Sequence, residues 1–120
     1  MFIAFVTFLP RMTTIQEYAN EVNTFIDERD WGKYQHPKDV AIALSIEAGE
    51  ILEHFRFKQE PKNKEALGEE LADVFIYLVS LAHRLGLDLD DCFRKKLELN
   101  RKKYPVDKFY GKNKKYDEVE

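Results

Sequence analysis

Four acidic residues at regular spacing are the first sign of chemistry in this sequence. Glu47 and Glu50 interrupt an apolar run over residues 40–52, and Glu70 and Asp73 repeat the same i, i+3 spacing where a second apolar run begins. Two side chains three residues apart lie on one face of a helix. Buried carboxylates are costly unless they are paired or hold a metal. Two such pairs on two helices therefore predict one multi-carboxylate site for a hard cation.

The histidines decide which metal this site suits. A di-iron bundle needs Glu-x-x-His motifs, but the residues three positions before His36, His54 and His83 are not acidic. The H-E-x-x-H pattern of zinc enzymes does not occur either. Ligands that are all oxygen select Mg²⁺, with Mn²⁺ as a substitute. We expect four further glutamates near these pairs to be solvated or paired with surface Lys or Arg: Glu53, Glu60, Glu65 and Glu69.

Four helices are predicted to position these acids, because glycine and proline occur only between the periodic apolar stretches. The first helix starts at a capping box that begins with Thr14. Gly86 suits the end of the third helix, and Asp88 suits the N-cap of the fourth. The expected ranges are 14–29, 38–57, 64–85 and 89–103. The fold class is all-α and four-helix-bundle-like, with the second helix central because it is apolar on nearly all sides.

Composition limits the function classes. The chain has 120 residues, a net charge of −3 and one cysteine, so we expect one domain, no nucleic acid polymer as partner and a reducing, cytoplasmic location. The apolar start is too short to span a bilayer and lacks the features of a signal peptide, so no membrane contact is expected. The expected division is a packing arm or upstream extension at 1–12, a domain at 13–105 and a polar tail at 106–120.

The acidic pairs and their surroundings resemble a known family. E-x-x-E from Glu47 and E-x-x-D from Glu70 resemble the metal signature of the MazG-like all-α nucleoside triphosphate pyrophosphohydrolases. The single-domain dCTP pyrophosphatase branch is similar over residues 13–105. The matching segments are E-R-D-W from Glu28, His36-Pro37, E-A-G-E-I-L-E-H-F-R-F-K from Glu47, E-E-L-A-D-V-F-I-Y-L-V from Glu69 and K-L-x-x-N-R-x-K-Y-P from Lys96.

The resemblance implies an activity and a metal site. Such enzymes cleave a nucleoside triphosphate, here dCTP-like or noncanonical, between the α- and β-phosphates, which gives monophosphate and pyrophosphate. By position, Glu47, Glu50, Glu70 and Asp73 would bind Mg²⁺, and Glu47 and Glu50 are the candidates for catalytic proton transfer. The resemblance also implies a homodimer or homotetramer.

Further residues are candidates for binding the substrate. Lys96, Asn100 and Lys103 form one stripe of the fourth helix that can face phosphates. Trp31 offers a surface for base stacking, which contributes roughly 1–3 kcal/mol. The other candidates are His36, Phe57, which stands where dCTP-directed relatives tend to carry Trp, and Tyr77.

Two other classes of function stay open at this point. A non-catalytic helical module that binds nucleotide or metal would use the same acids without turnover. A structural oligomerisation bundle would respond to neither ligand. The base and sugar preference, the number of metal ions, the general base and the choice between dimer and tetramer also stay open.

Overall fold

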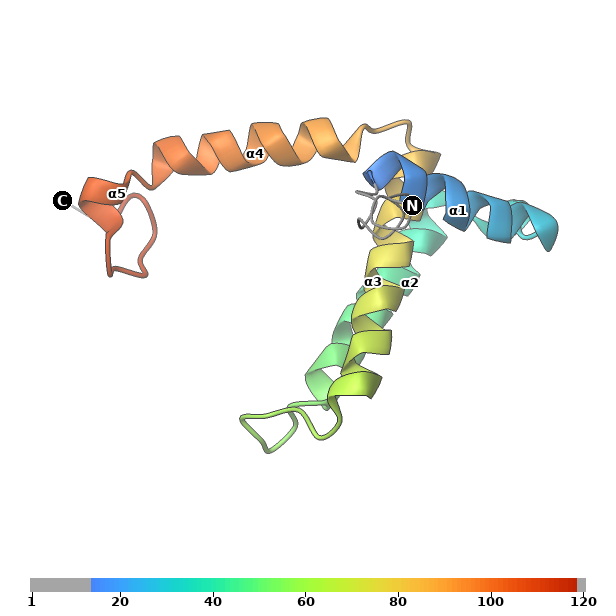
Figure 1. Ribbon diagram of the computed structural model, residues 1–120, viewed down its shortest axis with the longest axis horizontal. Helices are drawn as coiled ribbons and strands as arrows, with labels where there is room; N and C mark the ends of the chain where they lie inside the picture. Colours follow the sequence, from blue (N-terminus) through green and yellow to red (C-terminus); the bar gives the residue numbers. More distant parts are fainter. Residues whose placement is uncertain (1–13, 119–120) are drawn as a thin grey trace, which may run out of the picture. The chain divides into compact units, whose positions relative to one another are not determined.

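The computed structural model describes residues 14–118, whose regular structure is entirely helical (Figure 1). The elements are α1 (Ile15–Glu28), the 3₁₀ turn η2 (Gly32–Tyr34), α2 (Pro37–Glu53), α3 (Lys64–Arg84), α4 (Leu89–Lys103) and α5 (Val106–Phe109). The predicted all-α class is confirmed. The predicted extension at residues 1–12 lies outside the described residues. None of the helices within 14–118 has the length and hydropathy of a membrane span.

The helix starts follow their local capping residues. The Thr14 side chain accepts a hydrogen bond from the Glu17 backbone N–H at 3.1 Å, and Asp88 does the same for Asp91 at 3.2 Å, so both predicted N-caps are confirmed. Asn63 caps α3 in the same way, through the Ala66 N–H at 3.1 Å. Gly86 follows α3 with a φ of 67°, the left-handed conformation in which glycine is favoured.

The second helix is shorter than its predicted range of 38–57. It ends at Glu53, and the chain continues in turns as far as Phe57, which has a φ of 62°. A non-glycine residue rarely adopts this left-handed conformation. The sequence has no glycine or proline between Glu53 and Pro61 that would mark a helix end. The apolar pattern therefore predicted a helix that is one turn longer than the observed one.

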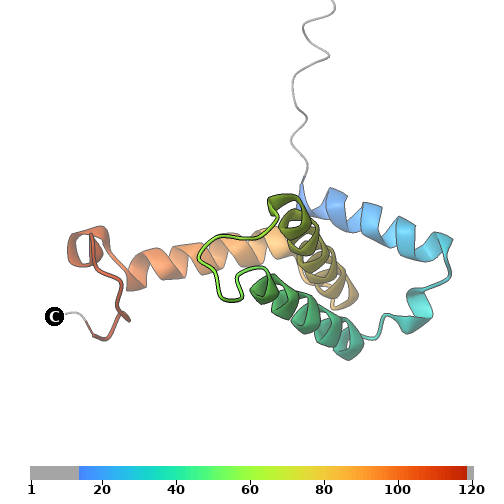
Figure 2. The same ribbon diagram turned by 90° about the horizontal axis from the view of Figure 1, so that it is seen from below.

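The chain divides into two compact units, one through Gly86 and one from Leu87. In the first unit α3 packs along α2 and also contacts α1 (Figures 1 and 2). The prediction that the second helix is central is therefore wrong for this unit, because α3 is the helix that contacts both of the others. The buried apolar side chains are Ala19, Ile26, Val40, Val79 and Ala82.

Large apolar side chains of α2 and α3 stay exposed. Ile42 and Ile46 are one turn apart on α2 and are 48% and 58% exposed. Leu71 and Leu78, two turns apart on α3, are exposed as well. The apolar residues of α2 therefore lie on several sides of the helix, and only Val40 among them is buried. Clustered exposed apolar residues of this kind mark surfaces that associate with something else.

The second unit holds α4 and α5. Three aromatic rings pack edge to face after α4, with Tyr104 centred 5.0 Å from Phe109 and 6.3 Å from Tyr116. The Lys103 ammonium lies 5.2 Å from the centre of the Tyr116 ring. No residue of α4 is buried. The division between the units falls inside the predicted domain at 13–105, whose boundaries stay a prediction.

Candidate functional site

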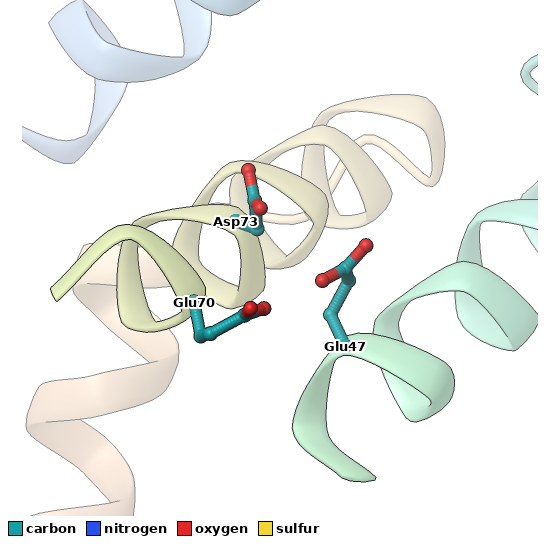
Figure 3. Close-up of side chains that lie close together, drawn as sticks. All are labelled: Glu47, Glu70 and Asp73. Carbon is teal, nitrogen blue, oxygen red and sulfur yellow. The ribbon is translucent and has the colours of Figure 1, made fainter. Parts of the chain in front are cut away.

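Three of the four predicted acids converge between α2 and α3. Glu47 of α2 and Glu70 and Asp73 of α3 each offer a carboxylate oxygen, and these oxygens all lie within 4.8 Å of one another. Figure 3 shows the three side chains pointing toward one another across the space between the two helices. The i, i+3 spacing on α3 aims both of its acids at α2. We call Glu47, Glu70 and Asp73 the carboxylate cluster.

Two oxygens of the carboxylate cluster are buried without a hydrogen-bond partner. They are Oε2 of Glu47 and Oε2 of Glu70. A buried polar atom that lacks a partner costs free energy, and in a native structure it needs an explanation. A cation between the two helices would supply that partner.

The surroundings of Glu47 favour its protonated form when no cation is present. Burial, the adjacent Glu50 carboxyl and the charge of Asp73 raise the pKa of Glu47 from 4.5 to about 7. Desolvation is the largest of these causes, because burial costs the charged carboxylate more hydration free energy than it costs the neutral carboxylic acid. Ionisation of these neighbouring acids therefore brings like charges together, which a divalent cation would neutralise.

Glu70 is held between an acid and a histidine. The neighbouring Glu50 carboxyl and burial raise the pKa of Glu70, and a positive charge on His54 would oppose this. His54 Nε2 lies 3.9 Å from Oε1 of Glu70, and the two side chains are 15% and 25% exposed. Oε1 of Glu70 therefore faces His54, and Oε2 is the oxygen that lacks a hydrogen-bond partner.

Glu50 lies beside the carboxylate cluster but outside its tight set of three. Its side chain is exposed on α2, yet its carboxyl interacts with both Glu47 and Glu70. All four predicted acids therefore form one interacting group, although the metal-ligand role of each stays a prediction.

The donor set fits a hard divalent cation. The carboxylate cluster offers oxygen ligands alone, from two helices, with water or substrate oxygens left to complete the shell. Mg²⁺ binds proteins through a few carboxylates and keeps several such exchangeable positions. Among residues 14–118, no other group of three or more His, Cys, Asp and Glu side chains comes this close together.

Two of the predicted substrate residues line one cavity of the first unit. Trp31 and Tyr77 border a space of about 110 Å³ that α1, the η2 region and α3 enclose. Trp31 is exposed and meets the Phe25 ring edge to face, with centroids 5.8 Å apart. Tyr77 is half-buried and lies one turn beyond Asp73 on α3. We call this space the Trp31–Tyr77 cavity.

His36 and Phe57 occupy other places. His36 is the N-cap of α2, where Nδ1 accepts a hydrogen bond from the Lys38 backbone N–H at 3.2 Å. Phe57 follows α2 and is 95% exposed, with the Arg56 guanidinium 5.3 Å from its ring centre. Neither residue lines the Trp31–Tyr77 cavity, and their roles in substrate binding stay predictions.

The three predicted phosphate-binding residues belong to the second unit. Lys96, Asn100 and Lys103 are all on α4, where Lys96 and Lys103 are exposed and Asn100 is half-buried. Their contact with a substrate stays a prediction.

Sequence reasoning missed three residues of the first unit. His54 was not linked to the acids, although it is the C-cap of α2 and follows Glu47 by two helical turns. Gln35 and Ser80 both line the Trp31–Tyr77 cavity. They are 45 residues apart, and the Ser80 hydroxyl lies 3.4 Å from Oε1 of Gln35. No periodic pattern signals such a long-range pair.

Known proteins resemble this chain along most of its length. Residues 42–119 match the MazG-like family. The dCTP pyrophosphatase 1 of Mus musculus is 39% identical over 115 residues, which cover 88% of this chain and 68% of that protein, and the Homo sapiens protein is 38% identical over the same shares. The crystal structure of a pyrophosphatase from Archaeoglobus fulgidus has a TM-score of 0.71 and 31% identity over 81% of this chain and 97% of that chain. The chain therefore belongs to the MazG-like family.

Proposed function

We propose that this protein is a nucleoside triphosphate pyrophosphohydrolase. It would hydrolyse a dCTP-like or noncanonical triphosphate between the α- and β-phosphates and release monophosphate and pyrophosphate. The observation that carries the proposal is the carboxylate cluster, in which two buried oxygens lack partners. The similarity to dCTP pyrophosphatases and to an archaeal pyrophosphatase supports a reaction of this kind.

The acids would act on the triphosphate through Mg²⁺, with Mn²⁺ as a substitute. A divalent ion bound here supplies neutralisation of phosphate charge and a more acidic water molecule. Glu70 and Asp73 project from successive turns of one helix and Glu47 faces them from α2, so the two packed helices hold the ligands in a fixed arrangement. Glu47 and Glu50 stay the candidates for accepting the proton of the attacking water.

We also propose that the protein works as a homo-oligomer. The buried apolar side chains of the first unit are few, whereas Ile42 and Ile46 of α2 and Leu71 and Leu78 of α3 are exposed. Burying such side chains contributes roughly 25 cal/mol per Å² of apolar surface. A second copy of the chain would cover these faces, and Glu50 lies one turn beyond Ile46 on the same side of α2. The carboxylate cluster would then lie near a subunit contact.

The single cysteine supports a cytoplasmic location for this enzyme. Cys92 is free and exposed on α4. Exposed thiols persist most readily in a reducing compartment. A nucleotide pool in the same compartment would supply the substrate.

Product analysis tests the proposed reaction. The purified protein is incubated with Mg²⁺ and a panel of canonical and modified triphosphates, and pyrophosphate, orthophosphate and monophosphate are measured separately. We expect pyrophosphate and monophosphate in equal amounts. Orthophosphate as the first product would contradict cleavage between the α- and β-phosphates. Nucleotide-dependent thermal stabilisation without any product would instead favour a binding module.

A further inference from the structure

An apolar groove lies between α1 and α3 of the first unit. Its volume is about 360 Å³, and apart from Glu21 its lining residues are apolar or aromatic: Tyr18, Val22, Phe25, Ala72, Phe75 and Ile76. Tyr18, Phe25 and Ile76 are exposed although they are large and mainly apolar. Among residues 14–118, no residue of α2 lines this space, so it is separate from the exposed face of α2. We call it the α1–α3 groove.

The walls of the α1–α3 groove are one stripe of each helix. Tyr18, Val22 and Phe25 follow one another at i, i+4 and i+7 on α1. The rings of Tyr18 and Phe75 meet edge to face, with centroids 5.2 Å apart, which joins the two walls. Pockets that enclose a drug-sized ligand measure about 300–1,000 Å³. The groove is therefore large enough for several apolar side chains of a peptide segment.

The chain has an apolar segment of its own close to this groove in sequence. Residues 2–9 carry no charged side chain, and Thr7 is their one polar residue. This segment lies outside the described residues. Alternate side chains of an extended segment share a face, so Phe2, Ala4, Val6 and Phe8 form a face without any polar residue. An uncovered run of this composition favours aggregation, so it needs an apolar surface to pack against.

The connection to α1 is long enough for this segment to reach the α1–α3 groove. The four residues from Pro10 to Thr13 span up to about 13 Å, at about 3.3 Å per extended residue. Tyr18 is four residues beyond the N-cap Thr14, which is about 6 Å along the helix. The wall from Tyr18 to Phe25 is about 10 Å long. Because proline favours turns, a reversal of the chain after Pro10 brings the preceding residues alongside this wall.

We propose that residues 2–9 dock in the α1–α3 groove of their own molecule, with Phe8 inside it and Thr7 at the surface. Arg11 is the only charged side chain before α1, and Glu21 is the only charged residue that lines the groove, so the charges are complementary. A segment tethered this closely has an effective concentration in the millimolar range. It therefore fills the groove ahead of a second copy at micromolar concentration.

Disulfide trapping tests the position of the segment. In a Cys92→Ser background, Thr7→Cys is combined either with Glu21→Cys, at the groove, or with Asn20→Cys, at the adjacent exposed position that does not line it. Because a disulfide needs Cα atoms within about 7 Å, we expect position 7 to link to position 21 at least about tenfold faster than to position 20, within one chain. Equal rates would overturn the docking. A product of two linked chains would overturn the assignment to the same molecule.

Melting temperatures test whether the docked segment stabilises the fold. Phe8→Asp places a charge in the apolar groove and should lower the melting temperature by at least about 4 °C. Thr7→Asp adds the same charge at the neighbouring surface position and is the matched control, which should melt close to the wild type. Both positions precede α1, so neither change alters a helix of the described chain. Equal melting temperatures for the two variants would overturn the proposal.

Removal of the segment gives an independent measurement. A chain that begins at Met12 keeps all described residues but lacks the proposed occupant of the groove. It should melt like Phe8→Asp and should bind more of the apolar dye ANS than the full chain, because the groove is then uncovered. Unchanged melting and dye binding would show that residues 2–9 leave the groove empty, which contradicts the proposal.

Discussion

At the scale of single residues, the carboxylate cluster is built for a cation and is unfavourable without one. The oxygens of Glu47, Glu70 and Asp73 gather within 4.8 Å, and burial together with the neighbouring acids raises the pKa of Glu47 to about 7. Functional sites commonly keep such strained electrostatics at the expense of stability. The cluster therefore makes stability depend on pH and on metal, in directions that the pKa shifts define.

Glu47→Gln should stabilise the metal-free protein at pH 8. The pKa of Glu47 is about 7 in the folded protein and near 4.5 when unfolded, so the folded state binds more protons between these values and stability falls as pH rises through this window. Glutamine removes the charge. Melting temperatures in EDTA should be higher for Glu47→Gln than for the wild type at pH 8, and the difference should shrink toward pH 5. A difference of the same size at both pH values would contradict this account.

His54→Ala should weaken metal binding. His54 Nε2 lies 3.9 Å from Oε1 of Glu70, so its removal takes away the side chain that faces this predicted metal ligand and holds it in place. Partners that orient metal ligands typically change affinity 10–100-fold, and calorimetry with Mn²⁺ at pH 7 should give a loss of about tenfold. His83→Ala, at an exposed position near the end of α3, is the matched control. Equal affinities in both variants would show that His54 plays no part in the site.

At the scale of elements, α3 supports both the carboxylate cluster and the Trp31–Tyr77 cavity. Glu70, Asp73, Tyr77 and Ser80 all project from this one helix. Its start depends on Asn63, whose side chain accepts the Ala66 N–H. The stability of α3 is therefore a condition for the whole site.

Asn63→Ala should destabilise the protein by about 1 kcal/mol, because the first turn of α3 loses its side-chain acceptor. Asn63→Gly should cost only a few tenths of a kcal/mol, since glycine is itself tolerated at an N-cap. Urea denaturation followed by circular dichroism measures both. If alanine and glycine had the same small effect, the cap would contribute little to α3.

The local chemistry of the helix ends was readable from the sequence, whereas the long-range pairs were not. Thr14 and Asp88 were predicted as caps because the capping signal lies within four residues. Phe57 was placed inside a helix because nothing nearby in the sequence marks the end at Glu53. Gln35 and Ser80 meet only because η2 and α3 fold together, so neither residue carried a signal before the fold was known.

At the scale of the whole molecule, exposed apolar side chains are the reason for proposing a homo-oligomer. The apolar pattern of residues 38–57 predicted a central helix, but α2 leaves Ile42 and Ile46 exposed in the first unit. If a second copy of the chain covers these two side chains, α2 is buried on more sides, as its apolar pattern predicts. The convergence of Glu47, Glu70 and Asp73 was predictable from their spacing, but the surroundings of these acids in an oligomer are not encoded in any local pattern.

Ile46→Glu should dissociate the proposed oligomer, because it introduces a charge where α2 would be covered by a second copy. Light scattering coupled to size exclusion should show a lower mass than for the wild type. Gln59→Glu adds the same charge at an exposed site of the connector and should leave the mass unchanged. A wild-type protein that is monomeric at all concentrations would contradict the oligomer directly.

The central claim is that the acids between α2 and α3 hold the metal for α–β cleavage, and neighbouring glutamates test it most directly. Glu69 is exposed and lies outside the carboxylate cluster, whereas the adjacent Glu70 belongs to it. Pyrophosphate release with Mg²⁺ is measured for Glu69→Gln and Glu70→Gln. We predict that Glu69→Gln stays close to the wild type and that Glu70→Gln loses activity by at least about 100-fold, since the loss of a ligand should exceed that of an orienting partner. Full activity in Glu70→Gln would contradict the claim.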